Sequence, residues 1–283
     1  MRVLLVPNVV NQAAVDAAVE LATWCGGAGL TPVLSVADAV ACGLSGFGVE
    51  PSDFGSLSLA VALGGDGTIL KAVHLIGENE VPLLGVKFGR LGFLSGARPE
   101  NMREAVEAAL AREARIERRA TLTARVVMEG REVGVYRALN EVVLTRGESG
   151  LVVSFEVAVG GHTVARTRAD GVIVATATGS TAYALSAGGP VVAPGFGGMV
   201  VVPVAPHTLQ ARAVLTDLAE TVEISLPDPQ RSDARVVVDG EPVPSRRAID
   251  RLVVCRGEFD VLLAKYDGRD FYETVAEEFF GSR

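Results

Sequence analysis

The sequence predicts an α/β N-terminal domain followed by a mostly-β C-terminal domain. In the first third of the chain, short apolar strand segments alternate with longer amphipathic segments, which is typical of a parallel sheet covered by helices. From about residue 115 to residue 265, strand segments separated by turn residues dominate. The chain has 283 residues, 49% of them hydrophobic, and this is enough for two domains with a core each.

The N-terminal domain, residues 1–114, begins with the buried strand signal RVLLV. Helical spacing of Val15, Val19 and Ala22 then predicts a helix, which a Gly-Gly pair ends. Pro99 stands near the N-terminus of another amphipathic segment, as is common in helices. The remaining signals of this domain are strands at 31–36, 57–63 and 81–87 and helices at 68–77 and 99–112.

The C-terminal domain, residues 115–265, is predicted from a series of strand signals. Gly160-Gly161 and Asp239-Gly240 are typical of tight hairpin turns. The strands are expected at 120–128, 132–145, 152–159, 162–168, 171–176, 199–205, 221–226, 234–240, 251–256 and 260–266.

The last segment of the chain, residues 266–283, contains the helical signal DFYETVAEEFF. We expect this helix to pack back on the N-terminal domain. No internal repeat or low-complexity tract is present.

Composition limits the classes of partner. A net charge of −8 argues against a general affinity for nucleic acid or anionic membranes, although a local basic pocket for a phosphorylated small molecule stays possible. Cys25, Cys42 and Cys255 lack metal-ligand spacing and are expected to be reduced thiols in a cytoplasmic protein. The first apolar run is too short for a signal peptide or a membrane span.

The stretch AVALGGDGTILK, residues 60–71, contains the first candidate site. Gly64, Gly65 and Gly67 follow a strand and precede a helix, so backbone N–H groups there can face a phosphate. The loop is neither a P-loop nor a dinucleotide GxGxxG loop. Asp66 fits a group that accepts a hydroxyl proton, or that holds a magnesium ion, during phosphoryl transfer. The alternative is a tight turn in which Asp66 only caps the helix.

A second constellation lies in DGVIVATATGSTAYALSAGGP, residues 170–190. Its strand ends in a turn where Thr178, Ser180 and Thr181 offer hydroxyl donors and Tyr183 offers an aromatic ring to a nucleobase. A Ser/Thr-rich turn that merely caps a short helix is the alternative.

Two polar pairs accompany this turn. Arg168 and Asp170 lie on one face of an extended strand, either as a charge pair beside a ligand or as a surface ion pair. Asn140 and Glu141 break an apolar strand, and this pair alone favours neither an exposed edge nor a site.

Together these segments resemble the NAD kinase family. The resembling stretches are LGGDGTIL (63–70), GRLGFLS (89–95), LNEVVLTRG (139–147), DGVIVATATGSTAYALSAGGPVVAP (170–194) and VAPHTL (204–209). They span nearly the whole chain in the family's order. GGDGT is shared with diacylglycerol kinases, sphingosine kinases and 6-phosphofructokinases, whereas GSTAYALSAGGP after an upstream Asn-Glu pair is far more specific.

The resemblance implies a Rossmann-like α/β N-terminal domain, a β-sandwich C-terminal domain that binds NAD, and an active site between them. It implies a phosphotransferase with an alcohol acceptor, which transfers the γ-phosphoryl group of ATP to the 2′-hydroxyl of the adenosine ribose of NAD. ATP would bind together with a divalent metal ion, with Mg²⁺ as the expected ion and no dedicated metal site in the protein. Neither nucleic acid nor a membrane would be a partner, and the family suggests a homodimer or homotetramer.

The resemblance also implies roles for single residues. Asp66 would be the catalytic base, and Gly64, Gly65, Gly67 and Thr68 would form the phosphate loop. Lys71 would reach the same crevice. The residues implied for binding NAD or nucleotide are Asp66, Gly67, Lys71, Asn140, Glu141, Arg168, Asp170, Thr181, Ala182, Tyr183, Ser186 and Ala205.

Three positions depart from the family pattern. Ala177 and Ala213 stand where the family usually has Pro, and Lys87 stands where it commonly has Asn. Lys87 adds a cation near the expected phosphate region. None of these departures removes an expected chemical group.

Two other functions compete. A lipid kinase of the diacylglycerol kinase type shares GGDGT, but the GSTAYALSAGGP segment and the Asn-Glu pair favour a dinucleotide. A non-catalytic nucleotide-binding protein would not need Asp66. His74, His162 and His207 lack metal-ligand spacing, and His207 is expected to shape the crevice rather than to transfer protons.

Overall fold

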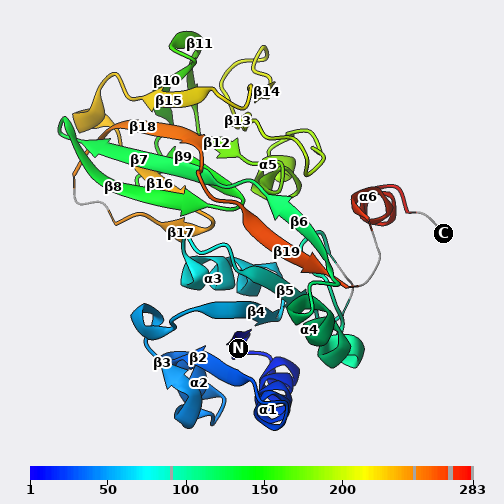
Figure 1. Ribbon diagram of the computed structural model, residues 1–283. Coiled ribbons are helices and arrows are strands. Elements are labelled where there is room, and N and C mark those ends of the chain that lie inside the picture. Colours follow the sequence, from blue (N-terminus) through cyan, green and yellow to red (C-terminus); the bar gives the residue numbers. More distant parts are fainter. Residues whose placement is uncertain (90–91, 245–246, 267–269, 282–283) are drawn as a thin grey trace. The chain divides into compact units, whose positions relative to one another are not determined.

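The computed structural model describes residues 1–89, 92–244, 247–266 and 270–281 (Figure 1). The chain divides into two compact units. Met1–Arg118 and Val261–Arg283 form the first unit, and Arg119–Asp260 form the second.

The first unit is built on a seven-stranded sheet of order β3-β2-β1-β4-β5-β19-β6, and its pairings from β3 to β19 are all parallel. Its helices pack on both faces. The strands are β1 (Arg2–Pro7), β2 (Thr31–Ser35), β3 (Gly48–Val49), β4 (Leu57–Leu63), β5 (Pro82–Val86), β6 (Arg115–Arg119) and β19 (Val261–Lys265), and the helices are α1 (Gln12–Gly27), α2 (Val36–Ala41), α3 (Asp66–Ile76), α4 (Met102–Leu110) and α6 (Phe271–Phe279).

One face of this sheet packs against α1 and α4, which share a buried cluster with alternate residues of β1, β4 and β5. The other face receives α3, since a side chain at Gly85 of β5 would collide with Ile69 of α3. The residues of α1 that enter the core include Ala14, Ala18 and Leu21, whereas Val19 is exposed. The predicted helix is thus confirmed, but its buried face is turned toward the alanines.

The strand at 261–265 corrects the predicted domain boundary. β19 pairs with β5 and lies between β5 and β6 in the first unit's sheet, although the sequence placed it in the C-terminal domain. Lys265 of β19 is buried and donates to the carbonyl oxygens of Phe93 (3.0 Å) and Ser95 (2.7 Å). These contacts, together with the β5 ladder, hold the strand in the first unit.

Asp270 caps the N-terminus of helix α6: its side chain accepts from the backbone N–H of Glu273, and the Glu273 side chain accepts from the N–H of Asp270. Its Phe271 and Phe279 rings lie 5.6 and 6.1 Å from the ring of Phe93. The C-terminal helix therefore contacts the first unit. Residues 267–269 and 282–283 of this predicted segment lie outside the described residues.

The second unit consists of two antiparallel six-stranded sheets, of order β11-β10-β15-β18-β7-β8 and β14-β13-β12-β9-β16-β17. The expected strands are present, with short additional ones. The strands are β7 (Leu122–Met128), β8 (Arg131–Ala138), β9 (Glu141–Arg146), β10 (Val153–Val159), β11 (His162–Ala169), β12 (Gly171–Ala175), β13 (Val200–Val204), β14 (Val214–Leu215), β15 (Thr221–Ser225), β16 (Ala234–Val238), β17 (Glu241–Pro242) and β18 (Ile249–Arg256).

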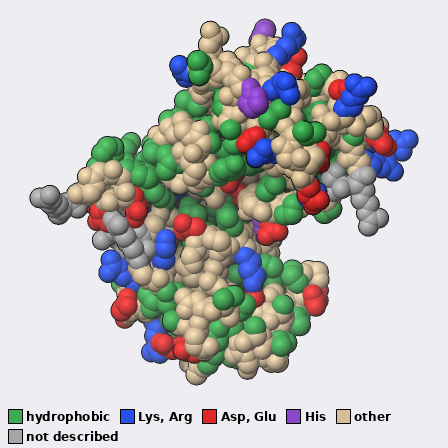
Figure 2. All heavy atoms as spheres, turned by 180° about the vertical axis from the view of Figure 1, so that it is seen from behind, with side chains coloured by type: hydrophobic (Ala, Val, Ile, Leu, Met, Phe, Trp, Pro, Cys, Tyr) green, Lys and Arg blue, Asp and Glu red, His purple; other side chains and the backbone are tan. Residues whose placement is uncertain are grey.

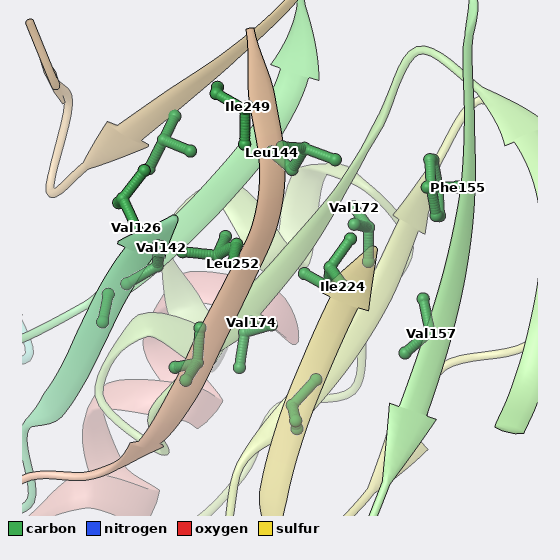
Figure 3. Packing of buried hydrophobic residues seen from close by; sticks show 14 of the residues in the cluster. Val126, Val142, Leu144, Phe155, Val157, Val172, Val174, Ile224, Ile249 and Leu252 are labelled. Atoms are coloured by element: carbon green, nitrogen blue, oxygen red, sulfur yellow. The ribbon is translucent and has the colours of Figure 1, made fainter. Parts of the chain in front are cut away.

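Strand alternation divides the apolar residues of this unit between two clusters. Val142, Leu144 and Val172 point into the core between the sheets, where residues of both sheets meet (Figure 3). Val143 and Ile173, one residue along each strand, point to the opposite face, where the short helix α5 (Tyr183–Ser186) packs. The mostly-β domain is thus a sandwich with one additional covered face.

The segment 132–145, expected as one strand, forms two. β8 ends at Ala138 in the first sheet of the sandwich, and β9 begins at Glu141 in the second. Leu139 and Asn140 make the crossing. The polar pair Asn140-Glu141 therefore marks the point where the chain changes sheets.

Candidate active site

The glycine loop lies at the carboxyl ends of the parallel strands of the first unit. β4 is buried up to Leu63, and the Gly64 N–H then donates to the Val86 carbonyl of β5 (2.9 Å). A Cβ at Gly64 would collide with the Thr68 side chain and would lie 2.9 Å from Asn8 Cβ. Only glycine lets the strand end this close to the first turn of α3.

The N-terminus of α3 presents backbone donors at this loop. Gly65 is the N-cap residue and provides no side chain to cap the helix. Among the residues that the structure describes, the N–H groups of Asp66 and Gly67 form no hydrogen bond. A Cβ on Gly67 would meet nothing within 4 Å. Unpaired N–H groups and the helix dipole favour an anion such as a phosphate at this end.

The Asp66 carboxylate is half exposed at the start of α3, and Lys87 approaches it from the end of β5. Lys87 Nζ lies 3.8 Å from Asp66 Oδ1. A Cβ at Gly92 would lie 2.7 Å from that ammonium and 3.7 Å from the same carboxylate oxygen. The sequence indicated Lys87 only as a departure from the family pattern, and its pairing with Asp66 was missed. Arg90 and Leu91 of the GRLGFLS stretch lie outside the described residues.

Lys71 has a different partner. Its ammonium forms a short ion pair with Asp38 of α2 (2.5 Å), and Asp38 is almost fully buried. The second carboxylate oxygen of Asp38 has no hydrogen-bond partner. The Lys71 side chain thus points toward α2 in this structure. The role expected for Lys71 in the Asp66 crevice stays a prediction.

In the second unit, one carboxylate holds residues 139–141, the crossing, where the chain passes from the first sheet of the sandwich to the second. Asp239 accepts from the backbone N–H groups of Leu139 (2.6 Å), Asn140 (2.8 Å) and Glu141 (3.0 Å). Asp239 and Gly240 both have positive φ, of 47° and 87°, as the predicted tight turn requires. The sequence identified Asp239 as a turn residue and missed its second role.

The hydroxyl-rich turn packs directly on this crossing. Thr176 donates its hydroxyl to the Leu139 carbonyl (2.6 Å) and accepts from the Gly179 N–H (3.0 Å). A Cβ at Gly179 would collide with the Asn140 backbone, so the close approach requires glycine. Ser180, which the sequence suggested as a ligand donor, is fully buried and donates to the Ala177 carbonyl (2.6 Å). Ser180 is therefore a structural residue of the turn.

Glu141 is the most perturbed carboxyl group of this cluster. Burial and the neighbouring charge of Asp239 raise the pKa of Glu141 to about 7, and hydrogen bonding to the Tyr183 backbone acts in the opposite direction. Its Oε2 atom is buried and has no hydrogen-bond partner. A carboxyl group of this kind can accept a hydrogen bond from a hydroxyl of a ligand.

Of the remaining candidates of this segment, Thr178 is buried and the others lie on the rim of the turn. Thr181 is half-buried and donates to the Thr178 carbonyl (3.2 Å), Ala182 is half-buried, and Ser186 is exposed. Tyr183 is 44% exposed and is therefore not a core residue. Its ring is available for stacking.

A third group lies where β11 and β13 end. Asp170 pairs with Arg146 (3.3 Å) rather than with the exposed Arg168, so the expected Arg168–Asp170 pair is replaced. The Arg168 carbonyl accepts from the His207 N–H (2.8 Å). Ala205, between these backbone contacts, is exposed and has a φ of 45°, a conformation that costs a non-glycine residue about 1 kcal/mol. The structure thus brings Arg168, Asp170 and Ala205 to one end of the second unit.

The surface in Figure 2 has both acidic and basic side chains on each unit. Among the residues that the structure describes, no helix is long and apolar enough to cross a membrane, and no three His, Cys, Asp or Glu side chains form a group suited to a metal ion.

Comparison with known proteins gives consistent matches along the chain. The ATP-NAD kinase N-terminal domain model matches residues 48–114, and the ATP-NAD kinase C-terminal domain model matches residues 139–266. A protein of Heliobacterium modesticaldum named NAD kinase is 38% identical over 222 residues, which cover 78% of each chain. Another of the same name from Geobacter metallireducens is 34% identical over 257 residues, covering 90% of each.

Two solved structures share the fold. The crystal structure of yeast NADH kinase complexed with NADH superposes with a TM-score of 0.89 at 24% identity and covers 99% of this chain and 87% of that one. The crystal structure of an NAD kinase from Archaeoglobus fulgidus in complex with ATP has a TM-score of 0.72 at 25% identity, covering 97% and 98%. The predicted fold class, an α/β domain followed by a mostly-β domain, is confirmed.

Proposed function

Since the chain belongs to the NAD kinase family, we propose that it transfers the γ-phosphoryl group of ATP to the 2′-hydroxyl of the adenosine ribose of NAD. The products are NADP and ADP. The observation that carries the proposal is the half-exposed Asp66 carboxylate, which stands at a glycine loop with unpaired N–H donors. Phosphoryl transfer needs this combination of an anion site and a base.

In this reaction the ribose 2′-oxygen forms a bond to the γ-phosphorus, and the bond from that phosphorus to the oxygen of ADP breaks. The hydroxyl proton passes to Asp66, and the electron pair of the broken bond leaves with ADP. Asp66 acts as the general base. Gly64, Gly65, Gly67 and Thr68 form the loop that faces phosphates.

The second unit binds the acceptor in this proposal. Asn140 and Glu141 hold the adenosine ribose, and the Glu141 carboxyl group accepts a hydrogen bond from a ribose hydroxyl. Tyr183 stacks on a base. The other residues proposed to contact NAD or nucleotide are Gly67, Lys71, Arg168, Asp170, Thr181, Ala182, Ser186 and Ala205.

A divalent metal ion accompanies ATP. Mg²⁺ is commonly held by one or two carboxylates together with substrate phosphates, and the lone Asp66 carboxylate beside an anion site fits an ion of this kind brought by the nucleotide. The ion, when bound, neutralises charge on the phosphates.

We also propose a cytoplasmic location and a homodimer or homotetramer. All three cysteines are free thiols, as expected for a reducing compartment. Sedimentation of the purified protein would determine the oligomeric state, and a monomer at assay concentrations would contradict this part of the proposal.

A product assay tests the function. Purified protein with ATP and Mg²⁺ is offered NAD, NADH or diacylglycerol, and the products are identified by mass. We expect NADP from NAD, and loss of most of this activity in Asp66→Asn. Phosphorylation of diacylglycerol without formation of NADP would reject the proposal in favour of a lipid kinase.

A further inference from the structure

Lysine is rare in this protein. Of 26 Lys and Arg residues only three are lysines, namely Lys71, Lys87 and Lys265, and all lie in the first unit. Lys71 forms an ion pair with the buried Asp38, and Lys265 donates to two backbone carbonyls. Each of these two ammonium groups has a defined structural partner.

Lys87 differs from the other two. Its Nζ lies 3.8 Å from Asp66 Oδ1, which is too far for a hydrogen bond, and no other acceptor contacts it in the ranges that the structure describes. The side chain is only 26% exposed. Three N–H donors are thus held near the proposed catalytic carboxylate without an acceptor of their own.

The backbone on either side of Lys87 determines where its side chain starts and how much room its ammonium has. The Lys87 backbone N–H donates to the Ala97 carbonyl (3.1 Å), which fixes the start of the side chain just after β5. A Cβ at Gly92 would lie 2.7 Å from Nζ, so the glycine leaves room for a compact ammonium. An arginine at this position would need more space for its planar guanidinium.

We propose that Lys87 binds the terminal phosphate of the phosphoryl donor and holds it beside Asp66. This inference rests on the proposed function. A half-exposed ion pair at 3.8 Å contributes little by itself, whereas a phosphate can accept charge-assisted hydrogen bonds from the unpaired donors. The ammonium keeps its protons throughout the reaction, since the hydroxyl proton goes to Asp66 and the electron pair leaves with ADP.

The test separates recognition of phosphate from recognition of the nucleoside. Lys87→Met removes the charge and keeps the length, and Lys87→Arg keeps the charge in a larger group. Arg103→Gln, which removes a cation from the exposed Arg103–Glu20 pair between α4 and α1, is the matched control. The measurements are the KM for ATP, the KM for NAD, the Ki of inorganic triphosphate against ATP, and the melting temperature.

We expect Lys87→Met to raise the KM for ATP and the Ki of inorganic triphosphate by about 10- to 100-fold, as for the loss of a charge-assisted hydrogen bond. The KM for NAD should change by less than about threefold, and the melting temperature should stay near that of the wild type. Lys87→Arg should show a smaller rise, and Arg103→Gln should match the wild type.

Three results would overturn the inference. These are an ATP KM within about twofold of the wild type, an unchanged Ki for inorganic triphosphate, or a parallel rise of both KM values with a lower melting temperature. Failure of the proposed function looks different, because the wild type itself would then form no NADP. In that case equilibrium binding of inorganic triphosphate to the wild type and to Lys87→Met still tests Lys87.

Discussion

The glycine loop of the first unit and the 139–141 crossing of the second unit are both candidate parts of the site, but they are built in different ways. The loop is five consecutive residues, Gly64–Thr68, and it contributes mainly backbone N–H groups to the candidate site. The crossing is assembled from distant segments, since Asp239 reaches back 100 positions to Leu139. Substitution of Asp66, whose side chain is half exposed, should therefore alter chemistry alone, whereas substitutions in the crossing should also alter stability.

The largest effect is expected for Asp66→Asn. Loss of a general base lowers kcat by roughly 10²- to 10⁴-fold, while the affinity for NAD and the melting temperature change little, because Asp66 is half exposed. Steady-state kinetics and thermal melting measure both quantities, with Asp16→Asn on α1 as the surface control. A variant that keeps more than about a third of the wild-type kcat would refute the role of Asp66.

Asp239→Asn tests whether a substitution at the crossing lowers the stability of the protein. Asn tolerates the positive φ of this position but presents an NH₂ group to one of the three buried N–H donors. We expect a loss of about 2–4 kcal/mol in the free energy of unfolding, from unpaired and weakened buried hydrogen bonds. Urea denaturation measures it, and Asp228→Asn, in an exposed pair with Arg231, is the control. Equal urea midpoints for Asp239→Asn and Asp228→Asn would show that the crossing does not depend on Asp239 for its stability.

Glu141→Gln tests whether the stability of the crossing region depends on pH. The folded-state pKa of Glu141 is raised from 4.5 to about 7, so the folded state binds more protons than the unfolded state between these values. Stability is therefore lost as pH rises from about 4.5 to 7, by at most roughly 3 kcal/mol. We expect the Gln variant to be more stable than the wild type at pH 8, with the difference shrinking toward pH 5. Parallel stability curves for the two proteins across this range would contradict the raised pKa.

The smallest effect is expected for Tyr183→Ala, which removes an exposed ring from the crossing region. Aromatic stacking on a base contributes about 1–3 kcal/mol, so the KM for NAD should rise roughly 5- to 100-fold. The KM for ATP should change less, and Tyr183→Phe should be milder than Ala. A collapsed melting temperature, or an unchanged KM for NAD, would show that the ring has another role.

Local signals in the sequence predicted local structure well. The order of strands and helices in the first unit follows apolar periodicity, and the two predicted hairpin turns show the positive φ values that their glycines suggest, as at Gly160 and Gly161. The short helix α2 was missed because six residues give too little periodicity. In α1, Ala22 of the predicted spacing is buried and Val15 packs against the core, but Val19 is exposed, because Ala14, Ala18 and Leu21 form the buried face.

Partners far apart in sequence could not be predicted. Nothing in the strand signal at 261–265 indicates which sheet it joins, because alternation fixes a strand's faces and not its neighbours. Two contacts of the candidate site also join residues that are far apart in sequence and meet only in the folded chain. These are the approach of Lys87 to Asp66 and the contacts of Asp239 with the crossing. The glycine loop could be found from sequence because all its parts are adjacent.

The position of β19 has a consequence for how the chain folds during synthesis. β19 leaves the ribosome after the whole second unit, yet it fills an interior place between β5 and β6. The sandwich is continuous in sequence, and its ends meet where the Gly257 N–H donates to the Thr121 carbonyl (2.7 Å). It can therefore close while the earlier sheet still lacks a strand. The glycine loop is translated early, but the sheet that supports it is completed last.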